Sequence, residues 1–233
     1  MAPLNLFPER LAYFESCKDF RSTWQYQNMM YATAGYFVEC VSGLSWEDFV
    51  RQRLFALLGM TNSYIDDRSA RESVMDYSLP YRSRHGEIKE LPFYSHWQAL
   101  APAGSIHSCI KDMSKRVRFH LNKGKVDDQQ LVSEEQMMQL HTSHMPGVDR
   151  ELITLDPRQF PELFYTNYAL GWFVTSYCGH TLLHHGGSIL LDQLCGWVRY
   201  TNCARSLYVS LTGILPHFHH LLCLSETWGF VGN

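Results

Sequence analysis

The chain has 233 residues, of which 45% are hydrophobic and 18% are charged, and its formal net charge is −3 at pH 7. This length suits one large domain, or one and a half small ones, with a substantial buried core. Because the charge is near neutral and the basic residues are scattered, we expect no binding to nucleic acid or to an anionic membrane. We also expect no membrane span, since no stretch is long and apolar enough to cross a bilayer.

The seven cysteines are odd in number, spread over most of the chain and include no Cys-x-x-Cys pair. This pattern disfavours a disulfide framework and favours a reducing compartment. The first residues also lack the basic region and uninterrupted apolar core of a secretory signal. A chain without its true N-terminus would have lost such a signal as well, so the compartment stays open.

The first half of the chain is predicted to be mainly helical, after an irregular lead-in over residues 1–25 that holds one short helical segment. Residues 29–41 are apolar on almost every side, which predicts a buried helix, with Gly43 as its C-terminal stop. Residues 45–58 place apolar side chains at helical spacing behind a serine cap and end before Gly59. We therefore expect two successive helices.

The region from 61 to 90 is polar and weakly periodic, which predicts a long surface excursion with a short hairpin near residues 85–86. An Ala-Pro-Ala-Gly turn at 101–104 leads into a predicted helix over 111–122. Ser108 stands just before this helix and is predicted to cap it.

A fourth helix is predicted over 133–141, again behind a serine cap. After Pro161 the pattern changes to short aromatic and β-branched runs separated by turn residues, which predicts strands at 168–177, 181–185, 193–200 and 206–211. Strands spaced this closely pair antiparallel through hairpins. Helices followed by an antiparallel meander predict an α+β fold.

Two short motifs could carry chemistry. Tyr26 and Asn28 flank the entry to the first long helix, where a phenol could carry a proton and an amide could orient a substrate carbonyl. The structural alternative, in which Tyr26 is a rim residue and Asn28 a helix cap, is favoured by this tripeptide alone.

The second motif is His185-Gly186-Gly187-Ser188 at the end of a predicted strand. Glycines there let a ligand approach the backbone, whose N–H groups can donate to a developing oxyanion. A strand-ending turn with an incidental histidine explains the same residues equally well.

Three segments in order, 24–63, 101–125 and 168–187, resemble the β-lactamase-related serine hydrolases, which include class C β-lactamases, DD-peptidases, esterases and animal β-lactamase-like proteins. They look like the family's Tyr-x-Asn segment with its helix pair, its Pro-Ala-Gly turn with the ensuing helix, and its Gly-Trp strand leading to a His-x-Gly motif. The resemblance implies a β-lactamase/transpeptidase-like fold, with an antiparallel sheet flanked by helices.

The resemblance also implies roles. Tyr26 would be the general base and acid, Asn28 would contact substrate, and His185 with Gly187 would form the wall beside the scissile carbonyl. Gly186 and Ser188 would line the same substrate site. The family needs no cofactor or metal, so we expect a small-molecule or peptide substrate as partner, and self-association is a further expectation.

The family's nucleophile is a serine in a Ser-x-x-Lys motif, well before the Tyr-x-Asn element. The residues that stand three before the six lysines are Glu15, Gly86, Ser108, Asp112, His120 and Asn122. Only Ser108-Cys109-Ile110-Lys111 fits, and it lies after Tyr26 where the family has an ordinary helix. We therefore predict a structural role for Ser108.

The expected organisation is a lead-in over 1–25, a partial family domain over 24–213 (helical over 24–145, strand-rich over 165–213) and an unassigned tail over 214–233. Because only 25 residues precede Tyr26, the N-terminal part of the fold is expected to be missing. The chain is then an incomplete hydrolase domain, inactive by itself, or a non-catalytic binding or scaffold protein of the same fold. A metal-dependent hydrolase is disfavoured, because the histidines lack metal-site spacing.

Overall fold

The computed structural model describes residues 6–11, 13–77, 79, 81–84, 87–92, 100–146, 166–177 and 180–185. The predicted strands at 193–200 and 206–211 and the tail over 214–233 lie outside the described residues. The elements in chain order are α1 (Leu6–Leu11), α2 (Asn28–Ser42), α3 (Trp46–Val50), the π-helical η1 (Arg51–Phe55), α4 (Ala56–Leu58), α5 (Asp67–Ser73), β1 (Tyr81–Arg84), β2 (Glu87–Glu90), α6 (Ala101–Gly104), α7 (Ile110–Leu121), β3 (Lys125–Val126), β4 (Gln129–Gln130), α8 (Glu134–His141), β5 (Met145–Pro146), β6 (Thr166–Tyr168), β7 (Phe173–Tyr177) and β8 (His180–His184).

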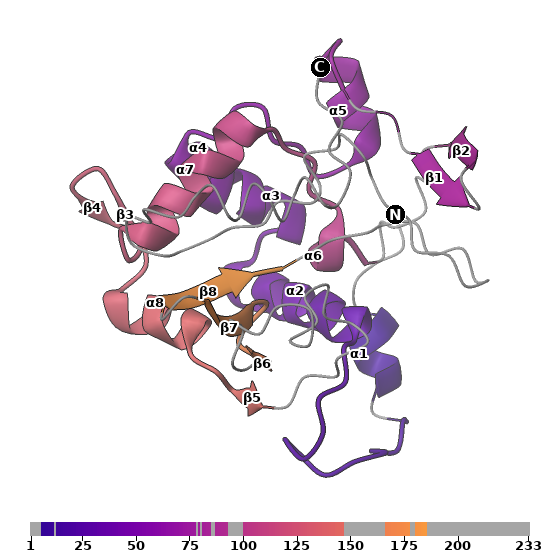
Figure 1. The fold of residues 1–233 in the computed structure, drawn as a ribbon, viewed down its shortest axis with the longest axis vertical. Coiled ribbons are helices and arrows are strands. Elements are labelled where there is room, and N and C mark those ends of the chain that lie inside the picture. The colour runs from indigo at the N-terminus through magenta and orange to yellow at the C-terminus, as the bar shows by residue number, and fades with distance from the viewer. Residues whose placement is uncertain are drawn as a thin grey trace.

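The largest sheet of the described residues has the strand order β5-β6-β7-β8, with every neighbouring pair antiparallel. Helices dominate the chain before it, so the predicted α+β class is confirmed (Figure 1). The single strand predicted over 168–177 is wrong in one respect. It is two strands, because a turn through Gly171, at φ +80°, separates Tyr168 from Phe173.

Helices cover both faces of this sheet. Phe173 lies opposite His184, while Val174 lies opposite Leu183, so the two pairs point to different faces. On the Phe173 face Tyr31 of α2 packs against the cluster of Tyr168 and Phe173, and on the Val174 face the contact is Val117 of α7. The sheet therefore lies between α2 and α7.

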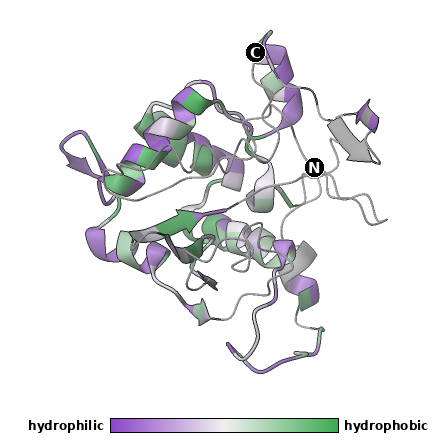
Figure 2. Cartoon of the chain, in the orientation of Figure 1, coloured by the Kyte–Doolittle hydropathy of each residue, from purple (hydrophilic) through white to green (hydrophobic). Residues whose placement is uncertain are grey.

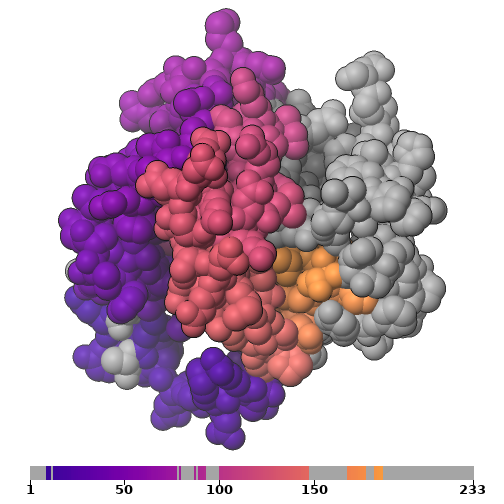
Figure 3. All heavy atoms as spheres, turned by 90° about the vertical axis from the view of Figure 1, so that its left-hand side faces the viewer, coloured from indigo at the N-terminus to yellow at the C-terminus, as the bar shows by residue number. Residues whose placement is uncertain are grey.

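The main hydrophobic core lies among the helices. It consists of the buried residues Trp46, Val50, Phe55, Leu58, Met60, Ile65, Ala101, Phe119 and Met137. The predicted helix over 45–58 is confirmed as the continuous run α3, η1 and α4. It starts at the Ser45 cap, whose hydroxyl accepts from the Asp48 N–H at 3.1 Å, and it stops at Gly59 with φ +67°. Residues 100–146 lie against this helical part on one side and against the described strands on the other (Figure 3).

The first long helix is confirmed as α2, but the prediction that it is buried all round is wrong. Among its side chains Met30, Phe37 and Val41 are 53%, 69% and 72% exposed. Its buried positions are the small residues Ala32 and Gly35. The face of α2 that carries these small residues permits close packing, whereas the larger apolar side chains of the helix are exposed.

The polar region from 61 to 90 contains one helix that the sequence reading missed. This helix, α5, starts at Asp66, whose carboxylate accepts from the Ser69 N–H at 2.7 Å. The hairpin expected near residues 85–86 is confirmed as the β1–β2 pair. Hydrophilic residues predominate on α5, whereas β8 carries two adjacent leucines and is green in its middle part (Figure 2).

Gly35 allows α2 to approach α6. A Cβ atom built on Gly35 would lie 2.2 Å from Cγ and 2.7 Å from Cβ of Pro102, and 3.3 Å from Cδ1 of Trp46. Because the proline ring cannot turn away, we expect Gly35→Ala to lower the free energy of unfolding by about 1–3 kcal/mol in urea titrations.

The matched control is Gly104→Ala, where the added Cβ meets no atom within 4 Å. This substitution should leave the free energy of unfolding unchanged or raise it by up to about 1 kcal/mol, through helix propensity alone. Equal effects of the two substitutions would contradict the close-approach explanation.

Candidate active site

The fold brings the two predicted motifs together. Tyr26 lies two residues before the start of α2 and His185 directly follows β8, and their ring centroids lie 5.9 Å apart at an interplanar angle of 39°. Gly186, Gly187 and Ser188 lie outside the described residues, so their predicted substrate-binding role stays a prediction.

Tyr26 keeps its proton at neutral pH. Burial of its ring and the neighbouring Tyr31 both raise the pKa of the Tyr26 phenol. The side chain is nevertheless 37% exposed, so a ligand can reach it. In the described environment the phenol is thus suited to donate a proton, and a base role would require a cation that lowers its pKa.

Asn28 is not the cap of α2, contrary to the structural alternative. Gln27 occupies that position, and its side-chain oxygen accepts from the Met29 N–H at 3.2 Å. Asn28 is the first residue of the helix and is partly buried. Its amide is therefore not committed to capping.

A hydrogen-bonded chain links α2 to the end of β8. The phenol oxygens of Tyr31 and Tyr168 lie 2.8 Å apart, and the Tyr168 oxygen lies 3.1 Å from Nε2 of His185. Sequence reasoning missed both tyrosines. Their signal is weak, because a tyrosine in an apolar helix or strand reads as core filling.

His184 is a second unexpected feature. Its ring is 2% exposed and stacks on Phe173, with the centroids 5.4 Å apart and the planes at 22°. Neither ring nitrogen has a hydrogen-bond partner among the residues that the structure describes. Burial first, and then the adjacent His185, lower the pKa of His184 to about 4, so this imidazole is neutral at physiological pH.

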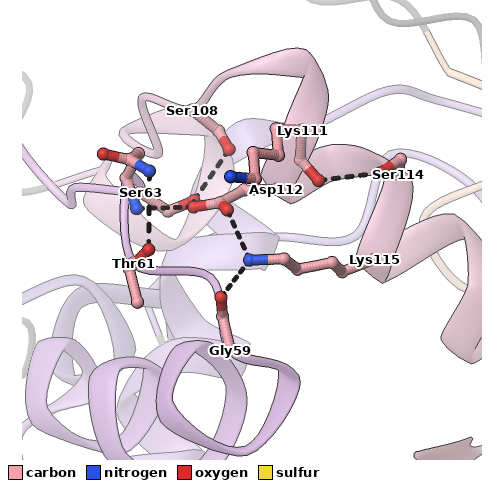
Figure 4. Close-up of polar contacts among 9 residues, drawn as sticks. Gly59, Thr61, Ser63, Ser108, Lys111, Asp112, Ser114 and Lys115 are labelled. Carbon is pink, nitrogen blue, oxygen red and sulfur yellow. Dashed lines mark hydrogen bonds and ion pairs between the residues drawn. The ribbon is translucent and has the colours of Figure 1, made fainter.

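Ser108 belongs to a separate polar network between the loop after α4 and the start of α7 (Figure 4). Its hydroxyl lies 2.8 Å from that of Ser63, which in turn donates to Oδ2 of Asp112 at 2.9 Å. The Asn62 N–H donates to the same carboxylate oxygen at 2.6 Å. Lys115 pairs with Oδ1 at 3.0 Å and also donates to the Gly59 carbonyl.

The centre of this network is a fully buried carboxylate. Burial by itself would raise the pKa of Asp112, but the hydrogen bonds from Lys115, Asn62 and Ser63 outweigh it and lower the pKa. Asp112 is therefore ionised and fully paired. The network joins the 59–63 loop to α7, which is a structural role.

The geometry of Ser108 and Lys111 does not resemble a nucleophile pair on one helical turn. Helix α7 begins at Ile110 with Cys109 at the cap position, so Ser108 lies outside it. The prediction that Ser108 caps this helix is wrong, because its hydroxyl is paired with Ser63. Lys111 is exposed, and its carbonyl accepts from the Ser114 hydroxyl at 2.7 Å (Figure 4).

Comparison with known proteins identifies the family. The family model described as Beta-lactamase matches residues 8–211. The chain belongs to the β-lactamase family. The antiparallel sheet and its flanking helices are thus the β-lactamase/transpeptidase-like fold that the resemblance implied, in the family of serine hydrolases.

Curated relatives of this β-lactamase-family chain include hydrolases. It is 25% identical over 174 residues to the Unguisins hydrolase ungD' of Aspergillus campestris (strain IBT 28561), covering 72% of this chain and 29% of the relative. It is 24% identical over 119 residues to Gigasin-6 of Magallana gigas, covering 50% of this chain and 39% of the relative. The chain thus spans well under half the length of either relative.

Solved structures share the β-lactamase-family fold. The octameric penicillin-binding protein homologue of Pyrococcus abyssi superposes with a TM-score of 0.61 at 22% identity, over 81% of this chain and 40% of that one. The D-amino acid amidase of Ochrobactrum anthropi, in complex with L-phenylalanine amide, gives 0.53 at 18% identity, over 72% and 44%.

Neither a membrane-spanning helix nor a metal-binding cluster occurs among the described residues. No helix in this part of the chain is both long and apolar enough to cross a membrane. Nor does this part bring three or more His, Cys, Asp or Glu side chains together in a way that could hold a metal ion.

The Asp112 network yields a stability prediction. Asp112→Ala leaves the partly buried Lys115 ammonium and the Asn62 N–H without their acceptor. We expect it to lower the free energy of unfolding by about 3–5 kcal/mol in urea titrations. Ser108→Ala, which removes one neutral hydrogen bond, should cost only about 1 kcal/mol, and a reversed order would contradict the structural role.

The buried His184 predicts a pH dependence. Its folded-state pKa of about 4 lies below the ordinary value of 6.5, so between these values the unfolded chain binds more protons. Stability contributed by this group is fully present above pH 6.5 and is lost as the pH falls towards 4, at up to about 1.4 kcal/mol per pH unit. Urea titrations from pH 7 to 5 should show this slope, and His184→Phe should reduce it; an unchanged slope in that variant would contradict the assignment.

Proposed function

We propose that this chain carries the proton-donating and substrate-binding half of a serine-hydrolase site for an amide, ester or β-lactam, and that it forms no acyl-enzyme by itself. The observation that carries the proposal is the 5.9 Å contact of Tyr26 with His185, next to Asn28 at the start of α2. Two segments far apart in the chain meet there.

The three residues have distinct roles in this proposal. In acyl transfer a nucleophile adds to the carbonyl carbon, the bond to the leaving group breaks, and the leaving group takes up a proton. The protonated Tyr26 phenol donates that proton. The Asn28 amide and the His185 imidazole hold the acyl group, and the backbone at Gly186 and Gly187, with Ser188, completes the substrate wall.

The proposed lack of acylation rests on Ser108. It is the single serine of the 233 residues in a Ser-x-x-Lys motif, and its hydroxyl is tied into the Asp112 network. The contact that the described residues give this hydroxyl is with Ser63, not with a lysine. A working site would need the nucleophile of a second Ser-x-x-Lys segment, and these 233 residues contain only the one at Ser108.

A covalent probe tests this part of the proposal. We expect a fluorophosphonate or penicillin probe to leave the chain unlabelled at Ser108, as measured by intact-mass spectrometry. A chain pretreated with denaturant serves as the control for non-specific reaction. Stoichiometric labelling that disappears in Ser108→Ala would overturn the proposal.

A binding experiment tests the substrate-side role. The relatives include an amidase solved with phenylalanine amide, and aromatic rings of Trp24 and Tyr168 surround Tyr26, so phenylalanine amide is a suitable probe. We expect it to perturb the amide NMR signals of residues 24–31. Asn28→Ala should weaken binding about tenfold, as expected when one buried polar partner is lost.

The matched control is Tyr13→Phe, at a site that is 88% exposed, beside Tyr26→Phe. The alternative from the sequence, a non-catalytic binding or scaffold protein of the same fold, predicts equal binding in Asn28→Ala, Tyr26→Phe and Tyr13→Phe. Our proposal predicts weaker binding in the first two alone.

A further inference from the structure

The face of the sheet that α7 covers carries a second group of polar side chains, which the proposed function does not use. Arg116 and His120 stand one helical turn apart on α7, and His141 is the last residue of α8. Trp172, in the turn between β6 and β7, packs in the same cluster as Val174 on this face. The group is therefore separate from the site beside α2.

The indole of Trp172 is the common neighbour of these three basic side chains. Its ring is 7% exposed, and Cζ of Arg116 lies over it, 5.7 Å from the centroid. The His120 and His141 rings stand at 75° and 82° to the indole, with centroid distances of 5.2 and 6.5 Å. Nδ1 of His120 lies 3.0 Å from Nε2 of His141, so the two imidazoles are hydrogen-bonded to each other.

The two histidines are neutral at physiological pH, so Arg116 supplies the charge of the group. Burial first, and then Arg116 and His141, lower the pKa of His120 to about 3. Burial also lowers the pKa of His141. Burial lowers the pKa of Arg116 too, but a guanidinium stays protonated in proteins. The group thus carries a single positive charge.

This positive charge has no counter-ion among the residues that the structure describes. Their ion pairs do not include Arg116, and its guanidinium has no hydrogen bond to any of them. A guanidinium that is partly removed from water without an acceptor is unfavourable, because it loses hydration and gains no partner. The side chain is still partly exposed, so a dissolved anion can reach it.

We propose that Arg116, lying over Trp172, binds a small carboxylate anion on this face of the sheet. The planar guanidinium presents a fork of N–H donors that matches the two oxygens of a carboxylate. A monoanion balances the single positive charge of the group, whereas a dianion such as phosphate would be only half balanced. Chloride cannot accept from the fork in two parallel hydrogen bonds.

A purely structural role for Arg116 makes a different prediction. In that case the guanidinium packs on the indole as a cation–π contact and needs no further partner. Acetate and chloride would then have the same effect on the chain at equal ionic strength. The response to a carboxylate therefore separates the two roles.

An NMR titration of the full chain with sodium acetate at pH 7.5 tests the proposal, with the ionic strength held constant by sodium chloride. The signals followed are the side-chain Nε–H of Arg116 and the indole N–H of Trp172, assigned by their loss in Arg116→Lys and Trp172→Phe. We expect both to shift saturably with acetate. Sodium chloride alone should cause no saturable shift, and phosphate should bind more weakly than acetate.

Three substitutions on α7 identify the donor. Arg116→Gln should weaken acetate binding, read at the Trp172 indole, about tenfold or more, the size expected when charge-assisted hydrogen bonds are lost. Arg116→Lys keeps the charge without the planar fork and should weaken binding by a smaller factor. Arg118→Gln is the matched control, because Arg118 is exposed on the same helix, and it should leave acetate binding unchanged.

Unfolding in urea gives a second measurement that does not need the NMR signals. A ligand that binds the folded chain raises its stability, so acetate should raise the urea midpoint of the native chain and of Arg118→Gln but not that of Arg116→Gln. No saturable response to acetate in the native chain, equal responses to acetate and chloride, or an acetate affinity that Arg116→Gln or Arg116→Lys leaves unchanged would overturn the proposal.

Discussion

The contact between α2 and the sheet positions the whole candidate site. Its polar part is the 2.8 Å hydrogen bond between Tyr31 and Tyr168, and its apolar part is the packing of Trp24 and Tyr31 against Phe173. Without this contact the start of α2 and the end of β8 would not meet, and Tyr26 would not lie beside His185.

A second constraint fixes the helical part independently of the site. The buried Asp112 carboxylate joins α7 to the 59–63 loop through Lys115, Ser63 and the Asn62 N–H. Ser63 also pairs with the Ser108 hydroxyl, which gives this serine a structural partner. A motif that fits a catalytic pattern in sequence thus has a structural explanation in three dimensions.

Local physical chemistry made much of the architecture predictable. The serine caps at Ser45 and Ser133, and the glycine stops at Gly43 and Gly59, depend on neighbouring backbone groups only, so the helix ends were predicted from a few residues. The change to short aromatic and β-branched runs bounded by turn residues predicted closely spaced antiparallel strands. The ordered motifs predicted the β-lactamase family.

The sequence by itself therefore determined the longer helices, the caps at Ser45 and Ser133, the fold class and the family, because each of these depends on neighbouring residues or on the order of motifs. Only the tertiary structure decided that Ser108 pairs with Ser63, that the outer face of α2 is exposed, and that Tyr168 reaches His185. These features depend on which residues distant in the chain meet across the packed elements. Periodicity shows which side of an element is apolar, but partners are chosen by packing between elements.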